Sequence, residues 1–268
     1  MQDKANKILE IDQSSEGILR LLLNDAKNKN PLSDKMMMQL KKQLFKASND
    51  NSIKVVIISA VGDVFCSGHN LKEITDARKN KDDGKSYFLD LYNLCSSLMQ
   101  MIISCSKPVI AEINGIATAA GCQLVASCDL AIASDSSKFA TPGVNIGLFC
   151  STPMVALSRN VSKKDSMKML LTGDMVDAVE AKRISLINDH VPDDKLNESV
   201  MSLAKKIATK PLSTVKIGKD AFYRQYEMSL SEAYEYTSKV MTINSLSDDA
   251  KEGITSFLEK RDPVWKDD

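Results

Sequence analysis

The sequence predicts an α/β protein whose first half, up to about Leu148, is rich in strands and whose second half is helical. Two observations lead to this prediction. Short apolar runs bounded by glycine, serine and asparagine recur through the first half, as in buried strands joined by turns. From Pro153 onwards, apolar residues recur every three or four positions, which is the spacing of amphipathic helices. With 268 residues, the chain has the length of one large domain, or of one domain with a helical appendage.

The first half is expected to contain six strands, over Ile8–Ile11, Ile18–Leu23, Val55–Ala60, Val109–Ile113, Leu130–Ala133 and Lys138–Ala140. Ser33 is the expected N-cap of a helix that runs to about Ala47. The apolar face of that helix is expected to hold Met36, Met37, Leu40, Leu44 and Phe45. A longer amphipathic helix is expected from about Tyr87 to Ser104, after a charged and exposed loop at Lys79–Lys85.

The second half is expected to be helical over Pro153–Asn160, Lys163–Leu171, Ala178–Ser185, Lys195–Ala208, Pro211–Tyr226, Ser231–Leu246 and Asp248–Glu259. Pro153 suits the first position of its helix. Only Asp189–Val191 is expected to be extended in this half.

Composition narrows the classes of function. Lys+Arg and Asp+Glu both number 35, so no overall field favours nucleic acid or an anionic membrane, and no apolar run reaches transmembrane length. The six cysteines form no CxxC pair and no metal-type spacing with His69 or His190, so no metal site is expected. We expect reduced thiols in an intracellular protein, with disulfides as the alternative.

The first residues, Met1–Lys7, have neither a hydrophobic core region nor the arginines of a transit peptide. We therefore expect a soluble intracellular protein. Its location would be cytoplasmic if the chain is bacterial, and mitochondrial if it is a processed eukaryotic protein.

The stretch Asn114–Asp129 organises the rest of the chain. It follows an expected strand, turns through glycine and small residues, and then has the pattern of a short buried helix that starts near Ala120 or Gly121. Such a corner points unpaired backbone N–H groups and the positive end of a helix dipole at whatever lies above it. The alternative is a small-residue turn that only lets a helix pack on a sheet.

A second corner has the same design. Gly62–Glu73 also follows a strand, turns through glycine and continues into a helical pattern. Two corners that each donate one N–H to the same oxygen would form an oxyanion hole.

In these segments the sequence resembles the enoyl-CoA hydratase/isomerase (crotonase) family, almost from end to end. The segments that carry the resemblance are Asn30–Ser33, Phe65–Glu73, Ile113–Asp129, Phe139–Leu148, Leu171–Gly173 with Ala178–Ala181, and Glu252–Arg261. Each is weakly specific alone, but their order and spacing are strongly specific together.

The resemblance implies a spiral of ββα units over residues 1–200 and a C-terminal helical region over 201–268 that packs trimers, or dimers of trimers. It implies an acyl-CoA thioester as ligand, with coenzyme A as part of that ligand and no prosthetic group. By motif position, the thioester oxygen would meet the backbone N–H groups of Ser67 and Ala120. The remaining ligand-binding positions implied by the resemblance are Lys27, Cys66, His69, Leu71, Gly115, Ala119, Pro142 and Gly147.

The sequence departs from the family where proton transfer is expected. The two hydratase glutamates are replaced by Gln123 and Gly143, and Ser151 stands near the position of an isomerase carboxylate. A glutamine can orient water but cannot transfer a proton usefully at neutral pH. His69 is the candidate substitute because its intrinsic pKa is suitable. Glu112 and Asp129 are expected to be structural.

Two hypotheses remain open. The first is an enzyme of fatty-acid metabolism: either an acyl-CoA hydratase or isomerase with low or altered activity, or an enzyme whose chemistry needs mainly enolate stabilisation. The alternative is a non-catalytic acyl-CoA-binding or regulatory module. The second hypothesis predicts binding without product, and a gain of hydratase activity when Gln123→Glu is combined with Gly143→Glu.

Overall fold

Two sheets form the centre of the molecule in the computed structural model, which describes residues 7–266. The larger sheet has the order β1 (Leu9–Gln13), β2 (Ile18–Leu23), β3 (Val55–Ala60), β5 (Val109–Ile113), β7 (Leu130–Ser134) and β10 (Asp189–Val191). The smaller sheet has the order β4 (Val64–Cys66), β6 (Ile116–Thr118), β8 (Lys138–Ala140) and β9 (Val176–Asp177). Apart from the antiparallel pairs β1–β2 and β8–β9, neighbouring strands are parallel.

The order of the strands reveals a repeated unit. β3, β5 and β7 lie side by side in the larger sheet, and the strand that follows each of them, β4, β6 or β8, lies in the smaller one. Helical segments follow each pair: α2 (Leu71–Ala77) with α3 (Lys85–Ser104), then α4 (Ala120–Ser127), then a 3-10 helix (Pro142–Ile146) with α5 (Pro153–Asn160). This is the expected α/β spiral of ββα units, and it brings the ends of β4 and β6 together.

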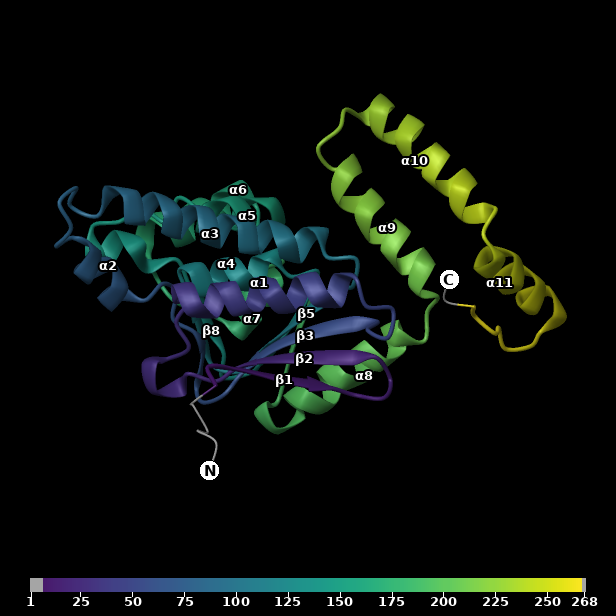
Figure 1. Cartoon of the computed structure of the whole chain (residues 1–268), viewed down its shortest axis with the longest axis horizontal. Helices are drawn as coiled ribbons and strands as arrows, with labels where there is room; N and C mark the ends of the chain where they lie inside the picture. Colours follow the sequence, from purple (N-terminus) through teal and green to yellow (C-terminus); the bar gives the residue numbers. More distant parts are fainter. Residues whose placement is uncertain (1–6, 267–268) are drawn as a thin grey trace.

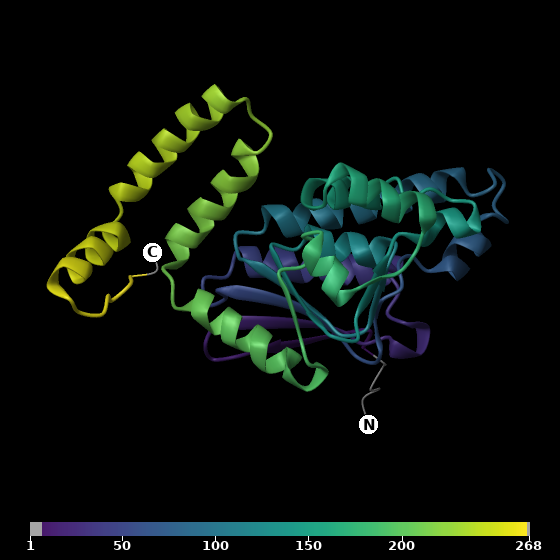
Figure 2. The same ribbon diagram turned by 180° about the vertical axis from the view of Figure 1, so that it is seen from behind.

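Helices cover both faces of the larger sheet (Figures 1 and 2). α1 (Asp34–Ser48) packs along α3, and the core on this side contains Leu21, Leu40 and Leu98. The opposite face is covered by α8 (Leu196–Ala208), whose Val200 and Ala204 pack against Ile57 and neighbouring residues of the sheet. α6 (Lys163–Thr172) and α7 (Ala178–Arg183) follow α5 at the smaller sheet's side.

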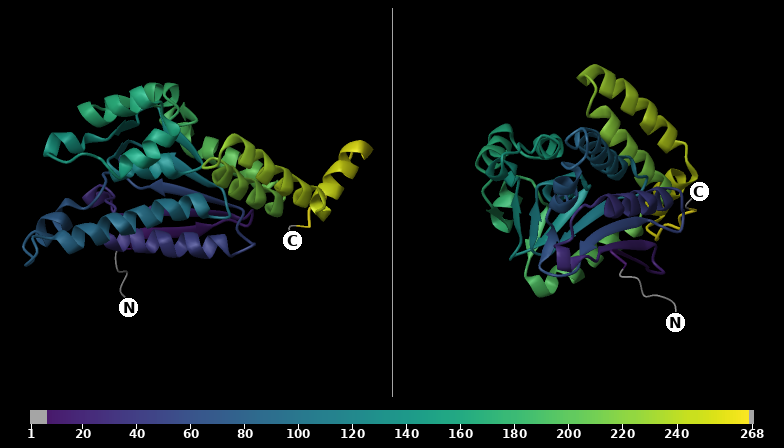
Figure 3. Two further views of the ribbon diagram at one scale, coloured as in Figure 1. Left: turned by 90° about the horizontal axis from the view of Figure 1, so that it is seen from above. Right: turned by 60° about the vertical axis from the view of Figure 1, so that its left-hand side comes forward.

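The C-terminal helices α9 (Leu212–Gln225), α10 (Leu230–Ser245) and α11 (Asp248–Glu259) extend away from the two sheets (Figure 3). The predicted division between the two parts, at residue 200, lies within α8. Because α8 still packs on the larger sheet, α9 is the first helix that leaves it. α9 is fixed to the core by Lys219, whose Nζ lies 2.6 Å from Asp129 Oδ2, and by the Tyr223 hydroxyl, which donates to Asp129 Oδ1 at 2.8 Å.

Exposed apolar side chains are frequent on these last helices, and they include Phe222, Tyr226, Leu230, Tyr234, Met241, Ile243, Leu246, Ile254, Phe257 and Leu258. Within residues 7–266, no helix has the length and apolar character that crossing a membrane requires.

Most of the expected elements are present, several with the expected bounds, and Ser33 caps α1 by accepting a hydrogen bond from the N–H of Met36. Three expectations were wrong. β4 and β6 lie within segments expected to be turns. Three residues carry little strand signal by themselves, and these strands form because β4 pairs with β6 and β6 also pairs with β8. Val176–Asp177 is also extended, paired with β8. Phe45 is 64% exposed, since it lies beside and not on the buried stripe of α1. The interpretation of Met1–Lys7 concerns residues that, except for Lys7, lie outside the described part.

Candidate functional site

The two glycine corners meet at one point of the structure. Gly121, in the first turn of α4, lies against the carbonyl group of Cys66, and a Cβ there would overlap that oxygen. Gly68 has a φ of +96°, and a Cβ on it would lie 3.1 Å from the carbonyl oxygen of Thr118 and 3.4 Å from the nitrogen of Ala120. The hydroxyl of Thr118 also donates to the carbonyl of Ser67 at 3.1 Å. Only residues without a side chain permit this approach of the two corners.

Each corner contains a backbone N–H that has no acceptor in the described part of the chain. Ala120 is the first residue of α4, and its N–H has no acceptor within residues 7–266. In the first corner, the N–H of Ser67 already donates to the carbonyl of Lys29 at 3.2 Å. The N–H of His69, two residues later, has no acceptor in the same described range. In the first corner the N–H of His69 is therefore free for a ligand, and that of Ser67 is not.

Ala119, which precedes the donor of the second corner, has a strained backbone. Its φ is +51° and its ψ is −117°, a combination that residues with a side chain rarely adopt. The conformation is held from both sides: the N–H of Ala119 donates to the carbonyl of Ala140 at 2.9 Å, and its carbonyl accepts from the N–H of Gln123 at 3.0 Å. This backbone conformation turns the chain sharply from β6 into α4, so that Ala120 lies next to Gly68 of the first corner.

Gln123 is buried in the second turn of α4. Its Oε1 accepts a weak hydrogen bond from the thiol of Cys95, on α3, at 3.7 Å. Burial raises the pKa of the Cys95 thiol to about 12, so this thiol remains protonated at neutral pH. The position predicted for the first missing glutamate thus holds a neutral amide against a neutral thiol.

The second position, Gly143, is enclosed by the chain that follows it. A Cβ on Gly143 would lie 2.6 Å from the carbonyl oxygen of Leu148 and 2.9 Å from Sγ of Cys150. The N–H of Leu148 also donates to the carbonyl of Gly143 at 2.9 Å, which closes this loop. No side chain fits at residue 143 unless the loop moves, which disfavours a gain of hydratase activity in the variant that combines Gln123→Glu with Gly143→Glu.

The imidazole of His69 is held between the first corner and α3. Its Nδ1 lies 3.3 Å from the carbonyl oxygen of Leu32, and its ring meets the ring of Tyr92 edge to face at 5.8 Å between centroids. Burial lowers the pKa of His69, because the charged imidazolium is poorly solvated there. Tyr92 and Cys95 were not singled out from the sequence. They are three residues apart on one face of α3, a helical spacing that carries no functional signal by itself.

The other predicted binding residues are spread around the corners. Lys27 is exposed, Leu71 is 56% exposed, and Cys66 is fully buried with its thiol pKa raised to about 12 by burial. Gly115 has a structural role, since its α-carbon lies against the carbonyl of Asp63. Pro142 starts the 3-10 helix and Gly147, with a φ of +76°, ends it. Among the predicted binding residues other than the donors, Ala119 is the one next to a donor in the chain, because it precedes Ala120.

Structural roles account for the two acidic residues near the second corner. Glu112 forms an ion pair with Arg20 at 2.8 Å, and Asp129 accepts from the N–H of Val109 at 2.7 Å besides its bonds to α9. Both expectations are confirmed. All six cysteines are free thiols, and no cluster within the described chain has the composition of a metal site.

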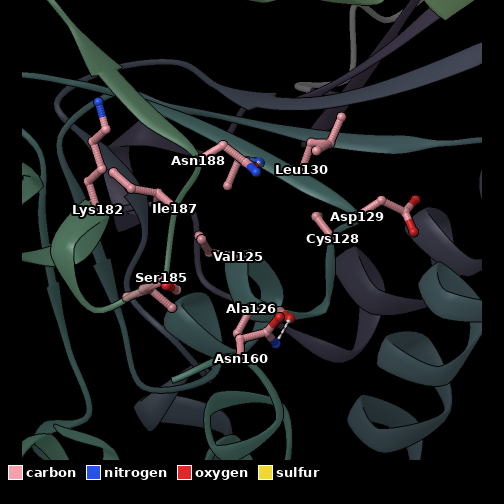
Figure 4. A pocket seen from close by; sticks show the side chains of 12 residues that line it. Val125, Ala126, Cys128, Asp129, Leu130, Asn160, Lys182, Ser185, Ile187 and Asn188 are labelled. Atoms are coloured by element: carbon pink, nitrogen blue, oxygen red, sulfur yellow. Dashed lines mark hydrogen bonds between the residues drawn. The ribbon is translucent and has the colours of Figure 1, made fainter. Parts of the chain in front are cut away.

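A separate cavity of about 350 Å³ lies at the opposite end of α4, between Val125, Asn160, Lys182 and Asn188 (Figure 4). Most of its polar side chains already have protein partners. Asn160 donates to the carbonyl of Ala126, Asn188 accepts from the N–H of Ala131, and Lys182 pairs with Asp189. Eight residues of helix separate Ala120 from Cys128, about 12 Å along the axis. This cavity is therefore distinct from the paired donors and offers little to a polar ligand.

The fold and the paired corners define a class of protein. A family model described as enoyl-CoA hydratase/isomerase matches residues 13–268, and the chain belongs to this family.

Within the family, the chain is similar to proteins that share one name. The chain is 48% identical over 257 residues to enoyl-CoA hydratase domain-containing protein 3, mitochondrial, of Xenopus laevis, and the match covers 96% of this chain and 86% of that protein. The human protein of the same name is 47% identical over 250 residues, covering 93% and 81%. The crystal structure of human enoyl-CoA hydratase domain-containing protein 3 superimposes with a TM-score of 0.92 at 46% identity, covering 97% of this chain and all of that one.

Proposed function

We propose that this protein binds acyl-CoA thioesters and polarises the thioester carbonyl with two backbone donors, the N–H groups of His69 and Ala120. The observation that carries the proposal is that, among the described residues, these two N–H groups have no acceptor at the point where the corners meet. A backbone pair of this kind stabilises the negative oxygen of an enolate, and the loss of one such donor costs on the order of 3 kcal/mol in comparable sites.

We further propose that the protein is not an efficient enoyl-CoA hydratase. Hydration needs groups that take a proton from water and give one to carbon. Gln123 supplies neither function, and the loop that encloses Gly143 leaves no space for a carboxylate. Two outcomes are compatible with the proposed binding: slow chemistry that depends mainly on enolate stabilisation, or a non-catalytic acyl-CoA-binding or regulatory module of fatty-acid metabolism.

Calorimetric titration with short and long acyl-CoAs tests the binding proposal. Ala120→Pro removes the donor N–H, and we expect it to weaken acyl-CoA binding at least tenfold. Because the backbone of Ala119 is unfavourable before a proline, the variant is combined with Ala119→Gly, which is also tested alone. Ala178→Pro, at the first position of α7, is the matched control and should bind as the wild type does. Absence of binding to every acyl-CoA, with the fold intact, would contradict the proposal.

Product analysis separates the two outcomes. A panel of 2-enoyl-CoA and 3-enoyl-CoA substrates is incubated with the wild type and with Ala120→Pro. Turnover that depends on the Ala120 donor favours the enzyme, and tight binding without product favours the module.

The assembly and the location are also proposals. The exposed apolar residues of α9 to α11 support the trimer, or dimer of trimers, that is typical of the family. The relatives in Xenopus laevis and human carry the word mitochondrial in their names, which supports a mitochondrial location if this chain is eukaryotic.

A further inference from the structure

Lys219, on α9, joins the C-terminal ends of two helices of the core. Its Nζ donates to the carbonyl of Ile102 in the last turn of α3 at 3.0 Å, to the carbonyl of Lys107 at 3.0 Å, and to Oδ2 of Asp129 at 2.6 Å. Asp129 stands two residues beyond the end of α4. The three bonds use every N–H of the ammonium group, whose side chain is 7% exposed. Lys219, Asp129 and Tyr223 are called the clamp below.

Asp129 is fixed within the core as well as to α9. Its Oδ2 also accepts from the N–H of Val109 at 2.7 Å, and its own N–H donates to the carbonyl of Val109 at 3.0 Å. Its Oδ1 accepts from the Tyr223 hydroxyl at 2.8 Å. Burial and the charge of Asp129 raise the pKa of Tyr223, so this hydroxyl stays protonated and donates. Bonds to a charged group that is largely withdrawn from water are strong, and the loss of one partner is costly.

The clamp also determines how the C-terminal arm, α9 to α11 (Leu212–Glu259), is attached. Among the apolar residues of α9, Leu212 and Ala221 are the buried ones. A cavity of about 550 Å³ lies between the end of α3 and α9, so packing between them is incomplete. The ion pair of Arg159 with Glu227, at 3.5 Å, is exposed to solvent and contributes little. Polar bonds of the clamp therefore hold α9 against the core more than apolar packing does.

The two helices that the clamp joins also frame the proposed site. α4 begins with the donor Ala120, about 12 Å along the helix axis from its C-terminal end. On α3, the ring of Tyr92 meets the imidazole of His69 at 5.8 Å between centroids, and the thiol of Cys95 donates to Gln123 of α4 at 3.7 Å. Short helices transmit a displacement from one end to the other. A change at the clamp therefore alters how α3 and α4 lie around the two donors.

We propose that Lys219 is a positioning residue for the acyl-CoA site, and that docking of the C-terminal arm and ligand binding are coupled through the clamp. The inference rests on the proposed acyl-CoA function and adds how that site is controlled. With Lys219 in place, the ends of α3 and α4 are held together, and the N–H groups of His69 and Ala120 keep their relative position. When α9 leaves the core, Asp129 loses its cation and the two helices lose their shared donor. Coupling is reciprocal, so a bound ligand favours the docked arm.

Calorimetric titration with butanoyl-CoA and hexadecanoyl-CoA tests the effect of the arm on the site. Lys219→Met keeps most of the side-chain length and removes the ammonium group, and it should weaken binding about tenfold, a magnitude typical of coupled sites. Tyr223→Phe removes one bond of the clamp and should weaken binding less. Lys239→Met is the matched control, because this lysine on α10 is exposed and pairs only with Glu235 among the described residues. It should bind as the wild type does.

Two further variants separate positioning from stability. Lys219→Met leaves the carboxylate of Asp129 without its cation, so Lys219→Met is also combined with Asp129→Asn, which removes both charges and should fold more readily. Leu9→Ala creates a cavity on the edge strand β1, at the other side of the larger sheet from β7. Urea denaturation measures the stability of each variant. The double variant should bind acyl-CoA about tenfold more weakly, and Leu9→Ala should bind as the wild type does although it unfolds more easily.

Amide hydrogen exchange tests the reverse effect, of the ligand on the arm, in the wild-type protein. Saturation with hexadecanoyl-CoA should slow exchange in α9 several-fold, because the bound state favours the docked arm. The same ligand should leave exchange in α9 unchanged in Lys219→Met, or in the double variant where the single one does not fold. A role of Lys219 in stability alone predicts no such response to ligand.

The outcomes separate this inference from the function on which it rests. Wild-type affinity in a folded clamp variant, or an equal loss of affinity in Leu9→Ala, would overturn the inference and leave acyl-CoA binding in place. So would exchange in α9 that does not respond to ligand in the wild type, or a response that persists without Lys219. Failure of the wild type to bind any acyl-CoA would overturn the proposed function itself.

Discussion

Gly121, in the first turn of α4, lies against the carbonyl group of Cys66 at the end of β4, with no space for a side chain between them. This contact sets the distance between the two corners and therefore between their free N–H groups. The Gly68 contact with Thr118 and Ala120 supports the same arrangement from the other side.

Gly121→Ala should consequently separate the corners. The added methyl group would overlap a backbone carbonyl that cannot rotate away, and we expect a loss of about 3 kcal/mol in unfolding free energy together with loss of acyl-CoA binding. Urea denaturation and calorimetry measure the two effects. Gly218→Ala, in the exposed middle of α9 with open space around it, should instead stabilise by about 1 kcal/mol. Equal behaviour of the two variants would contradict this role of Gly121.

Relief of the strain at Ala119 should stabilise the protein. Glycine adopts the observed φ of +51° and ψ of −117° at little cost, so Ala119→Gly is expected to raise the unfolding free energy by about 1 kcal/mol. Thermal denaturation checks this. Ala126→Gly, in the regular part of the same helix, should destabilise by about 1 kcal/mol. A destabilising Ala119→Gly would show that the strain is not stored in this residue.

Restoring the glutamates should not restore a hydratase. Gln123→Glu alone replaces an amide by a group of the same size, so we expect the variant to fold. Addition of Gly143→Glu should cost about 3 kcal/mol or more, because residue 143 is enclosed by Leu148 and Cys150. The rate of 2-enoyl-CoA hydration is measured as the loss of absorbance of the conjugated thioester. This rate should remain at background in the double variant. Efficient hydration by a stable double variant would contradict the conclusion that the loop around residue 143 leaves no space for a glutamate.

His69 should make stability depend on pH. Its pKa is lower in the folded protein than its ordinary value of 6.5, so the unfolded chain binds a proton first as the pH falls. Stability that is complete above pH 6.5 is therefore lost below it, with a slope of at most about 1.4 kcal/mol per pH unit from this one group.

Urea titrations between pH 7.5 and pH 5 measure the effect, and the difference between wild type and His69→Phe isolates it. Glu73, whose pKa is raised by burial, is present in both proteins and has the opposite sign of pH dependence. Parallel stability curves for the two proteins would mean that His69 titrates normally in the folded state.

Long apolar runs made much of this fold predictable from sequence. Ile18–Leu23 and Val55–Ala60 are strands with the predicted bounds, and Pro153–Asn160 is a helix with the predicted bounds. In each, local pattern and tertiary burial favour the same structure. β4 and β6 escaped prediction because three residues beside a glycine carry little local preference, and their pairing across the corner is what makes them strands.

The site was predictable as a location but not in its detail. The two corners and the neutral Gln123 are visible in the sequence. The bond from the Ser67 N–H to the carbonyl of Lys29 depends on a loop that approaches from β2, and the enclosure of Gly143 depends on the path of the chain at Leu148. Neither follows from residue type or spacing, because both are set by contacts between separate segments.

A crystal structure with a bound acyl-CoA shows whether the backbone N–H groups of His69 and Ala120 hold the thioester oxygen. We expect this oxygen at about 2.7–3.1 Å from both backbone nitrogens, with the Ser67 N–H still bonded to the carbonyl of Lys29. An oxygen bonded to the Ser67 nitrogen, or an acyl-CoA whose thioester lies away from both corners, would contradict it.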